Sequence, residues 1–237
     1  MTLFHPFFRP FFRLVAATLG MACLPCGAQQ GGKLALQFMT FPMTMKPLQV
    51  ELLVGEGKTV KLDVPSNELG PIVRVPRMSS LVFGKTDVNE EGEPEFKIYG
   101  QGKPVAAPKQ LVLLLRKGRD MAAGFEVRVI SSDVKKFAGG KLLFVNAAKI
   151  SIGGYAGGVQ FAIKPGAHTI VKPKLEANGR LAHVKFFYNK KGKASPFFSS
   201  MWPIAKHNRG LVFFYHNPKN ANKIQLHTFR HFLEVDD

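Results

Sequence analysis

The chain has few cysteines, and both of them lie near its start. Cys23 and Cys26 fall within residues 1–28, which have the pattern of a secretory signal peptide. Two arginines and no acid precede an apolar run over residues 14–24, which is too short to cross a bilayer. Small residues at positions 26–28 predict cleavage before Gln29. We therefore expect a periplasmic or secreted protein.

Two other readings of this segment are an uncleaved anchor and a lipid-anchored start at Cys23. Gly20 disfavours the second, because a lipid-attachment signal has an apolar residue three positions before the cysteine. The mature chain would then be residues 29–237, which contain no cysteine and no second run long enough to span a membrane. This excludes disulfides and thiol chemistry. A chain of this length can form a core without metal or disulfide cross-links.

Acidic residues are also scarce. The full chain has 33 Lys and Arg against 16 Asp and Glu, a formal net charge of +17, which falls to +15 without residues 1–28. Such an excess favours anionic partners, namely anionic polysaccharide, lipopolysaccharide, an acidic envelope protein or a membrane surface. Export disfavours nucleic acid. The alternative is a solvated basic surface without a partner.

Sequence motifs of catalysis are missing. The chain has no nucleophile elbow, zinc-protease helix, phosphate loop or dinucleotide fingerprint. Its histidines lack metal-ligand spacing, so no metal site and no cofactor is predicted. Few carboxylates are available for a glycosidase pair, and nothing nominates two of them. The sequence leans against an enzyme.

Two stretches resemble parts of metal sites. Met39, Met43 and Met45 could bind copper(I), although methionine more often fills an irregular core. Residues 87–95 match the first half of a calcium loop, but Ile98 stands where the bidentate Glu belongs. We expect a core or edge strand in the first case and a solvated acidic turn in the second.

Period-two alternation predicts an all-β fold. Residues 48–54 and 59–64 form a hairpin whose aliphatic residues share one face only with a three-residue loop, and Gly57 suits its left-handed position. Residues 110–115 are continuously aliphatic, as in a strand buried on both faces. We expect about 12–14 short strands in an antiparallel β-sandwich, immunoglobulin-like or jelly-roll-like, with one helical turn over 131–137. The alternatives are one domain over 29–237 and two sandwiches, 29–135 and 136–237.

The most detailed prediction concerns residues 171–186. A two-residue turn at Asn178-Gly179 would pair Val171 with Phe186 and give one apolar and one basic face. The basic face would carry Lys172, Lys174, His183 and Lys185, which we interpret as a candidate site for an anionic ligand. Pro173 marks an edge strand, so these lysines could instead prevent edge-to-edge pairing.

A second candidate is an aromatic and basic surface formed by Trp202, Lys206, His207 and Arg209. Aromatic residues in such strands are more often part of the core. A groove in which Trp202 or Tyr155 meets carboxylates would instead indicate a carbohydrate-binding protein or a carbohydrate-active enzyme.

The strands of residues 142–171, with the turns IGGYAGG and IKPGAH, resemble uncharacterised secreted β-sandwich proteins of Gram-negative bacteria. The resemblance extends to the segments PFFSSMWPI and GLVFFYHNP. It implies a fold and a compartment, and no functional residue. We therefore expect an exported, non-catalytic protein that binds or organises anionic envelope or extracellular material. The alternatives are the carbohydrate-directed protein and a periplasmic metal-handling protein.

Overall fold

The protein is all-β. The computed structural model describes residues 32–118, 120–176, 179–190, 193–217 and 220–233, so the expected signal peptide and both cysteines lie outside the described residues. This part of the chain forms four four-stranded sheets, and its only helical element is the 3₁₀ turn η1 (Met121–Ala123). It contains no helix that is long and apolar enough to cross a membrane.

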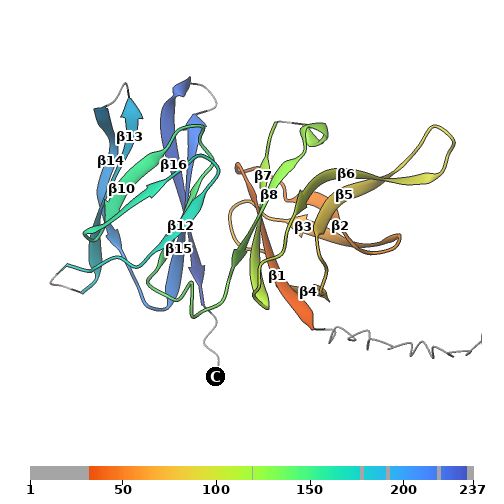
Figure 1. The fold of residues 1–237 in the computed structure, drawn as a ribbon, viewed down its shortest axis with the longest axis horizontal. Helices are drawn as coiled ribbons and strands as arrows, with labels where there is room; N and C mark the ends of the chain where they lie inside the picture. Colours follow the sequence, from red (N-terminus) through yellow and green to blue (C-terminus); the bar gives the residue numbers. More distant parts are fainter. Residues whose placement is uncertain (1–31, 119, 177–178, 191–192, 218–219, 234–237) are drawn as a thin grey trace, which may run out of the picture. The chain divides into compact units, whose positions relative to one another are not determined.

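The first two sheets are built from residues 33–131, in the orders β4-β1-β7-β8 and β3-β2-β5-β6 (Figure 1). All pairings are antiparallel except β1 with β7, which is parallel. The strands are β1 (Lys33–Phe41), β2 (Leu48–Gly55), β3 (Lys58–Val64), β4 (Val73–Pro76), β5 (Leu81–Val88), β6 (Pro94–Gly102), β7 (Lys109–Arg116) and β8 (Phe125–Ser131).

The other two sheets are built from residues 142–232, in the orders β12-β9-β15-β16 and β11-β10-β13-β14. Here the parallel pair is β9 with β15. The strands are β9 (Leu142–Asn146), β10 (Ile152–Ala156), β11 (Val159–Ile163), β12 (His168–Val171), β13 (Leu181–Lys190), β14 (Lys193–Pro203), β15 (Asn208–Asn217) and β16 (Asn220–Phe232). The described residues thus hold sixteen strands, more than the number expected from the sequence, and the sheets are mixed rather than purely antiparallel.

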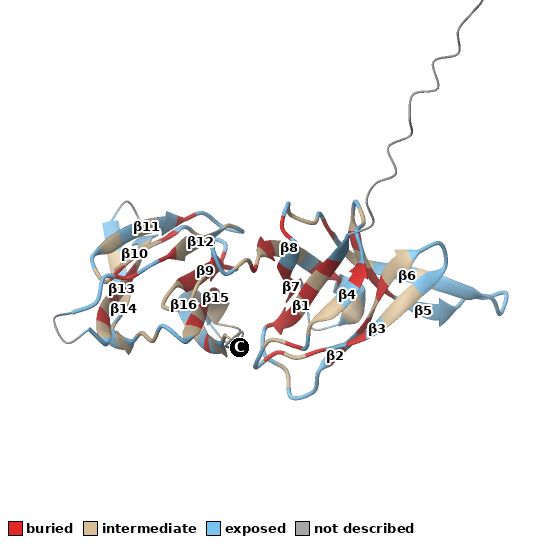
Figure 2. Cartoon of the chain, turned by 90° about the horizontal axis from the view of Figure 1, so that it is seen from below, coloured by how far each residue is buried: buried red, intermediate tan, exposed pale blue. Residues whose placement is uncertain are grey.

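Two of the sheets are apolar on both faces. Alternate residues of β1 and β7, such as Phe38 and Val112, enter a core shared with β2, β3 and β5. Their neighbours, such as Phe41 and Leu113, enter a second core with β9 and β15. The rings of Phe41 and Phe213 stack there at 4.8 Å. Burial on both faces was predicted from the aliphatic run of β7 and is confirmed. Figure 2 shows buried residues along β1 and β7.

All pairings among the described residues join strands within 33–131 or within 142–232. The second core nevertheless contains side chains from both segments. Residues 132–141 connect them. The helical turn expected over 131–137 is found only as a hydrogen-bonded turn: the amides of Lys136 and Phe137 donate to the Asp133 carbonyl, and Asp133 Oδ1 accepts from the amide of Lys135. The division into one domain or two stays a prediction.

The two turns predicted from the sequence are present, although the loop of the first hairpin differs from the prediction. In that hairpin Leu52 pairs with Val60 and Val50 with Leu62, as expected. The predicted three-residue loop was wrong: Gly55 pairs with Lys58 and the register shifts between Leu53 and Gly55, so that the turn is Glu56-Gly57, with Gly57 at φ +65°. The predicted IKPGAH turn is closed by a hydrogen bond from the Ala167 amide to the Lys164 carbonyl, with Gly166 at φ +78°, as in a type II turn.

The pairing proposed for residues 171–186 was wrong. β12 pairs with β9, so that Val171 lies opposite Leu142, whereas Phe186 of β13 lies opposite Gly154 and Phe198. The two segments belong to different sheets, and residues 172–176 cross from one sheet to the other without strand structure. One bond of the expected register remains, from the Glu176 amide to the Leu181 carbonyl. Asn178 lies outside the described residues.

A further expectation for the second half was also wrong. Tyr155, expected in the turn IGGYAGG, lies in β10, and the turn follows at Gly157-Gly158. Pairing overrides the weak local signal of the glycines here, because β10 has strand partners on both sides, β11 and β13.

Candidate functional site

The positive charge is concentrated in one half of the chain. Residues 134–233 contain 17 Lys and Arg but a single acid, Glu176, whereas residues 29–133 contain 14 Lys and Arg and 12 Asp and Glu. The two salt bridges found among the described residues, Lys97 with Asp87 and Arg128 with Glu126, both lie in the first half. Residues 134–233 therefore carry a large excess of positive charge.

Sheet β11-β10-β13-β14 lies within this cationic half. No Asp or Glu occurs in its four strands. Its inward face packs Val184 and Phe186 into the core of the second half. Because side chains alternate along a strand, His183, Lys185 and Phe187 point to the opposite face. All three are half-buried.

Tyr155 of β10 completes this outward face. It lies directly across from Lys185. Its ring contacts the rings of His183 at 5.6 Å and Phe187 at 6.3 Å, and Lys185 Nζ lies 5.3 Å from the centre of the Phe187 ring. We call Tyr155, His183, Lys185 and Phe187 the Tyr155 face.

The predicted basic set is only partly gathered. His183 and Lys185 lie on the Tyr155 face, whereas Lys172 and Lys174 are exposed in the segment that crosses between the sheets. Lys174 reaches this region through its backbone, because its amide donates to the Gly157 carbonyl and the Gly157 amide donates to the His183 carbonyl. The set is thus brought near β10 by the Gly157 turn and not by the hairpin that was predicted. Binding of an anion there stays a prediction.

The predicted aromatic and basic surface was wrong for Arg209. Trp202 is half-buried on the inward face, with its ring 5.7 Å from the rings of Phe186 and Phe198. Lys206 and His207 are exposed in the turn after β14. Arg209 is only 3% exposed. The four residues therefore do not share one surface.

Arg209 instead joins β15, β16 and the connecting segment. Its Nη1 donates to the carbonyls of Ser132 and Phe137, its Nη2 donates to Ser132 Oγ at 2.8 Å, and its Nε donates to His231 Nδ1 at 2.9 Å. The guanidinium also stacks on the Phe137 ring at 4.5 Å. None of these partners is a carboxylate. Burial accordingly lowers the pKa of Arg209 to about 10.

His231 gives this cluster a pH dependence. Burial, and secondarily the charge of Arg209, lowers the pKa of His231 to about 4. The unfolded chain, with the ordinary pKa of 6.5, therefore binds the proton first as pH falls. We expect the free energy of unfolding to be unaffected by His231 above pH 7 and to fall by about 1–2 kcal/mol between pH 6.5 and pH 4, after allowance for the partial exposure of the ring.

Urea denaturation at several pH values measures this effect. His231→Gln keeps an acceptor for Arg209 but cannot be protonated, so the difference between the two proteins should shrink as pH falls from 7 to 4. Acid groups such as Glu51 contribute equally to both proteins. Parallel stability curves for the two would contradict the assignment.

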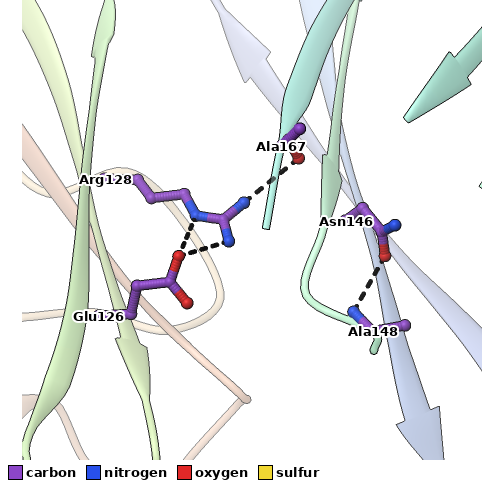
Figure 3. Close-up of polar contacts among 5 residues, drawn as sticks. All are labelled: Glu126, Arg128, Asn146, Ala148 and Ala167. Atoms are coloured by element: carbon purple, nitrogen blue, oxygen red, sulfur yellow. Dashed lines mark hydrogen bonds and ion pairs between the residues drawn. The ribbon is translucent and has the colours of Figure 1, made fainter. Parts of the chain in front are cut away.

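A cleft of about 640 Å³ lies beside Arg128 and is lined by Phe41, Leu115, Lys149, Pro165 and His216 among others. Arg128 donates from Nε and Nη2 to Glu126 Oε1 and from Nη1 to the Ala167 carbonyl at 3.2 Å (Figure 3). Asn146, fully buried nearby, accepts from the Ala148 amide and donates to the carbonyls of Ile150 and Ile163. The guanidinium is thus committed to internal partners, and the polar groups here brace the chain.

Arg128 was not among the predicted site residues, because its alternation with Val127 and Val129 in β8 is typical of a position in contact with solvent. It is 8% exposed, since the sheet is covered on both sides and its second face meets the turn at Ala167. Nothing in the local pattern of β8 distinguishes this arginine from one in contact with water.

Neither stretch that resembled part of a metal site gathers ligands. Met39 is 1% exposed within the core, whereas Met43 and Met45 are 48% and 105% exposed. In the acidic stretch, Asn89 Oδ1 accepts from the amides of Glu91 and Glu93, and Asp87 pairs with Lys97 at 3.1 Å. Those contacts form the solvated β5–β6 turn that we expected, whose end is exposed (Figure 2). No group of three or more His, Cys, Asp or Glu side chains able to hold a metal occurs in the part of the chain that the structure describes.

No family model matches the chain, and no curated protein matches its sequence. Two features of the chain itself bear on its function: the excess of positive charge in the second half, and within it an outward sheet face that combines aromatic rings with Lys185 and His183.

Proposed function

We propose that the protein is an exported, non-catalytic module that binds anionic envelope or extracellular material through its second half, residues 142–232. The observation that carries this proposal is the charge distribution, with 17 Lys and Arg against one acid over residues 134–233. The other three acids of the second half, Glu234, Asp236 and Asp237, come together at the end of the sequence. A polyanion meets attraction from many sites at once and little repulsion.

Export, to the periplasm or to the outside, belongs to the same proposal. The pattern of residues 1–28 supports it, and so does the resemblance to secreted β-sandwich proteins. Lipopolysaccharide, anionic polysaccharide and acidic envelope proteins are the anions available in that compartment. The expected partner is therefore a polymer or surface that carries repeated negative charges.

Heparin and polyphosphate are suitable probes for residues 29–237. We expect binding at low salt that weakens steeply as salt rises, because the partner displaces condensed counterions. Replacing exposed lysines of the second half, Lys172, Lys174 and Lys223, with Gln should weaken binding by about tenfold at low salt. Titration followed by fluorescence anisotropy measures both effects.

The matched control replaces the exposed lysines Lys46, Lys58 and Lys103 of the first half with Gln. Both triple variants lose the same net charge, so a difference between them reports the location of the binding surface. Equal losses would show that only total charge matters. Binding that is absent at low salt, or unaffected by salt, would refute the proposal.

A further inference from the structure

The Tyr155 face is an apolar surface that the fold leaves uncovered. The rings of Tyr155 and Phe187 lie side by side on the outward face, tilted by 43°. Met201 of β14, opposite His183, is 43% exposed on the same face. Tyr155 and Phe187 are half-buried, and apolar side chains that reach solvent together on one sheet face commonly mark a binding surface. A solvent-facing sheet surface usually carries polar residues, so the apolar side chains of Tyr155, Phe187 and Met201 need an explanation.

Two small residues widen this surface. Gly153 lies opposite Phe187 on β13 and opposite Ala162 on β11. A Cβ on Gly153 would meet a single atom within 4 Å, the Phe161 carbonyl oxygen at 3.8 Å. A side chain would therefore fit here. Because Gly153 has none and Ala162 has only a methyl group, the backbone of β10 and β11 is accessible beside the Phe187 ring, and we call this shallow region the low area. Tyr155 and the exposed Gln160, which lie opposite each other, border this low area.

The charges on this face are positive. Lys185 Nζ lies over the Phe187 ring, and His183 Nε2 lies 3.0 Å from Ser199 Oγ. The four strands contribute no carboxylate. A ligand that covers the backbone at Gly153 and Ala162 would thus contact the aromatic carbon of Tyr155 and Phe187 and reach the Lys185 ammonium group, which lies over the Phe187 ring.

We propose that the Tyr155 face binds an acidic polysaccharide, with a uronic acid residue lying against Tyr155 and Phe187 and its carboxylate paired with Lys185. This inference rests on the proposed function and names its ligand class and its site. The C–H groups of a sugar ring carry partial positive charge and pack against the negative face of an aromatic ring. Pairing between the carboxylate and the ammonium group is a charge-assisted hydrogen bond. Gln160 and Ser199 supply hydrogen-bonding groups for the sugar hydroxyls.

Geometry favours a sugar over a nucleobase. Base stacking needs an open aromatic plane, whereas Lys185 lies over the Phe187 ring and the Tyr155 ring meets the His183 ring edge-on, at 70°. A sugar ring needs only part of an aromatic face. A lipid surface would require longer apolar side chains, and the low area at Gly153 and Ala162 offers none.

The test uses residues 29–237 with polygalacturonate as the acidic polysaccharide and polyphosphate as an anion without sugar rings. Tyr155→Leu removes the ring and Lys185→Gln removes the charge. We expect either change to weaken binding of polygalacturonate by about five- to tenfold. Only Lys185→Gln should reduce the salt dependence, and Tyr155→Leu should leave polyphosphate binding unchanged.

Lys58→Gln, at an exposed lysine of β3 in the first half, is the matched control and should affect both ligands only through net charge. Circular dichroism and urea denaturation verify that each variant is folded. Unchanged polygalacturonate binding in both Tyr155→Leu and Lys185→Gln would overturn the site while the proposed function stands. The site is also overturned if oligouridylate or phosphatidylglycerol vesicles bind more tightly than polygalacturonate and depend on Tyr155. Loss of all polyanion binding by the unaltered chain would instead refute the proposed function.

Discussion

Replacing Arg209 with Ala is expected to lower the free energy of unfolding by about 3–5 kcal/mol. The side chain satisfies two carbonyls, a hydroxyl and an imidazole nitrogen; Arg209, Ser132 and Phe137 are buried, whereas His231 is partly exposed. Its removal leaves these groups without their donor and opens a void against Phe137. Chemical denaturation of residues 29–237 measures the loss.

Two variants separate the sources of this effect. Arg209→Lys keeps a charge but lacks the planar fork, so it should recover less than half of the lost stability. Lys206→Ala, in the exposed turn nearby, should change stability by less than about 0.5 kcal/mol. A loss below about 1 kcal/mol for Arg209→Ala would show that the connecting segment does not depend on this arginine.

The second large effect is expected for Gly157→Ala, with a loss of about 3 kcal/mol or more. Gly157 has φ +54°, a conformation that costs an L-residue about 1–2 kcal/mol by itself. In addition, a Cβ at this position would lie 1.9 Å from the Lys174 carbonyl oxygen and 2.6 Å from the Lys174 amide nitrogen. Both are backbone atoms, so the crossing segment would have to move.

Gly158 is an adjacent control. It has φ +76°, but a Cβ there would meet nothing within 4 Å. Gly158→Ala should therefore cost only the conformational term, about 1 kcal/mol. Similar losses for the two variants, measured by urea denaturation, would contradict the close approach of Lys174 to Gly157. A further loss of polyanion binding in Gly157→Ala would agree with displacement of Lys172 and Lys174.

In the candidate site, strand alternation predicted which side chains share a face but not which strands pair. His183 and Lys185 were correctly predicted to share a face, because side chains alternate whatever the partner strand is. Their partner was predicted wrongly. Asn178-Gly179 is a strong hairpin signal, but β12 pairs with β9 and β13 with β10 and β14. A turn motif favours a hairpin locally. It does not determine which of several apolar strands forms the most stable pair with β12 or β13.

Tyr155 was placed in a turn because glycines surround it. In the structure those glycines allow close backbone contacts. A Cβ on Gly154 would be 2.5 Å from the Lys185 carbonyl oxygen of β13, and a Cβ on Gly157 would collide with the backbone of Lys174. Close approach of distant backbone segments leaves no local signature other than glycine itself, which also marks turns.

The all-β class, the strand pairing of the first hairpin, the turn at Gly166 and the burial of β7 on both faces were predicted correctly, because alternation, turn residues and apolar runs are local properties. The excess of positive charge follows from composition alone. The positions of Arg209, Arg128 and Tyr155 were not predictable from local patterns: the two arginines are buried and hydrogen-bonded, and the tyrosine lies on an outward sheet face. Those placements depend on which strands pair and which sheets are covered on both faces, and such choices are settled by contacts between residues far apart in the chain.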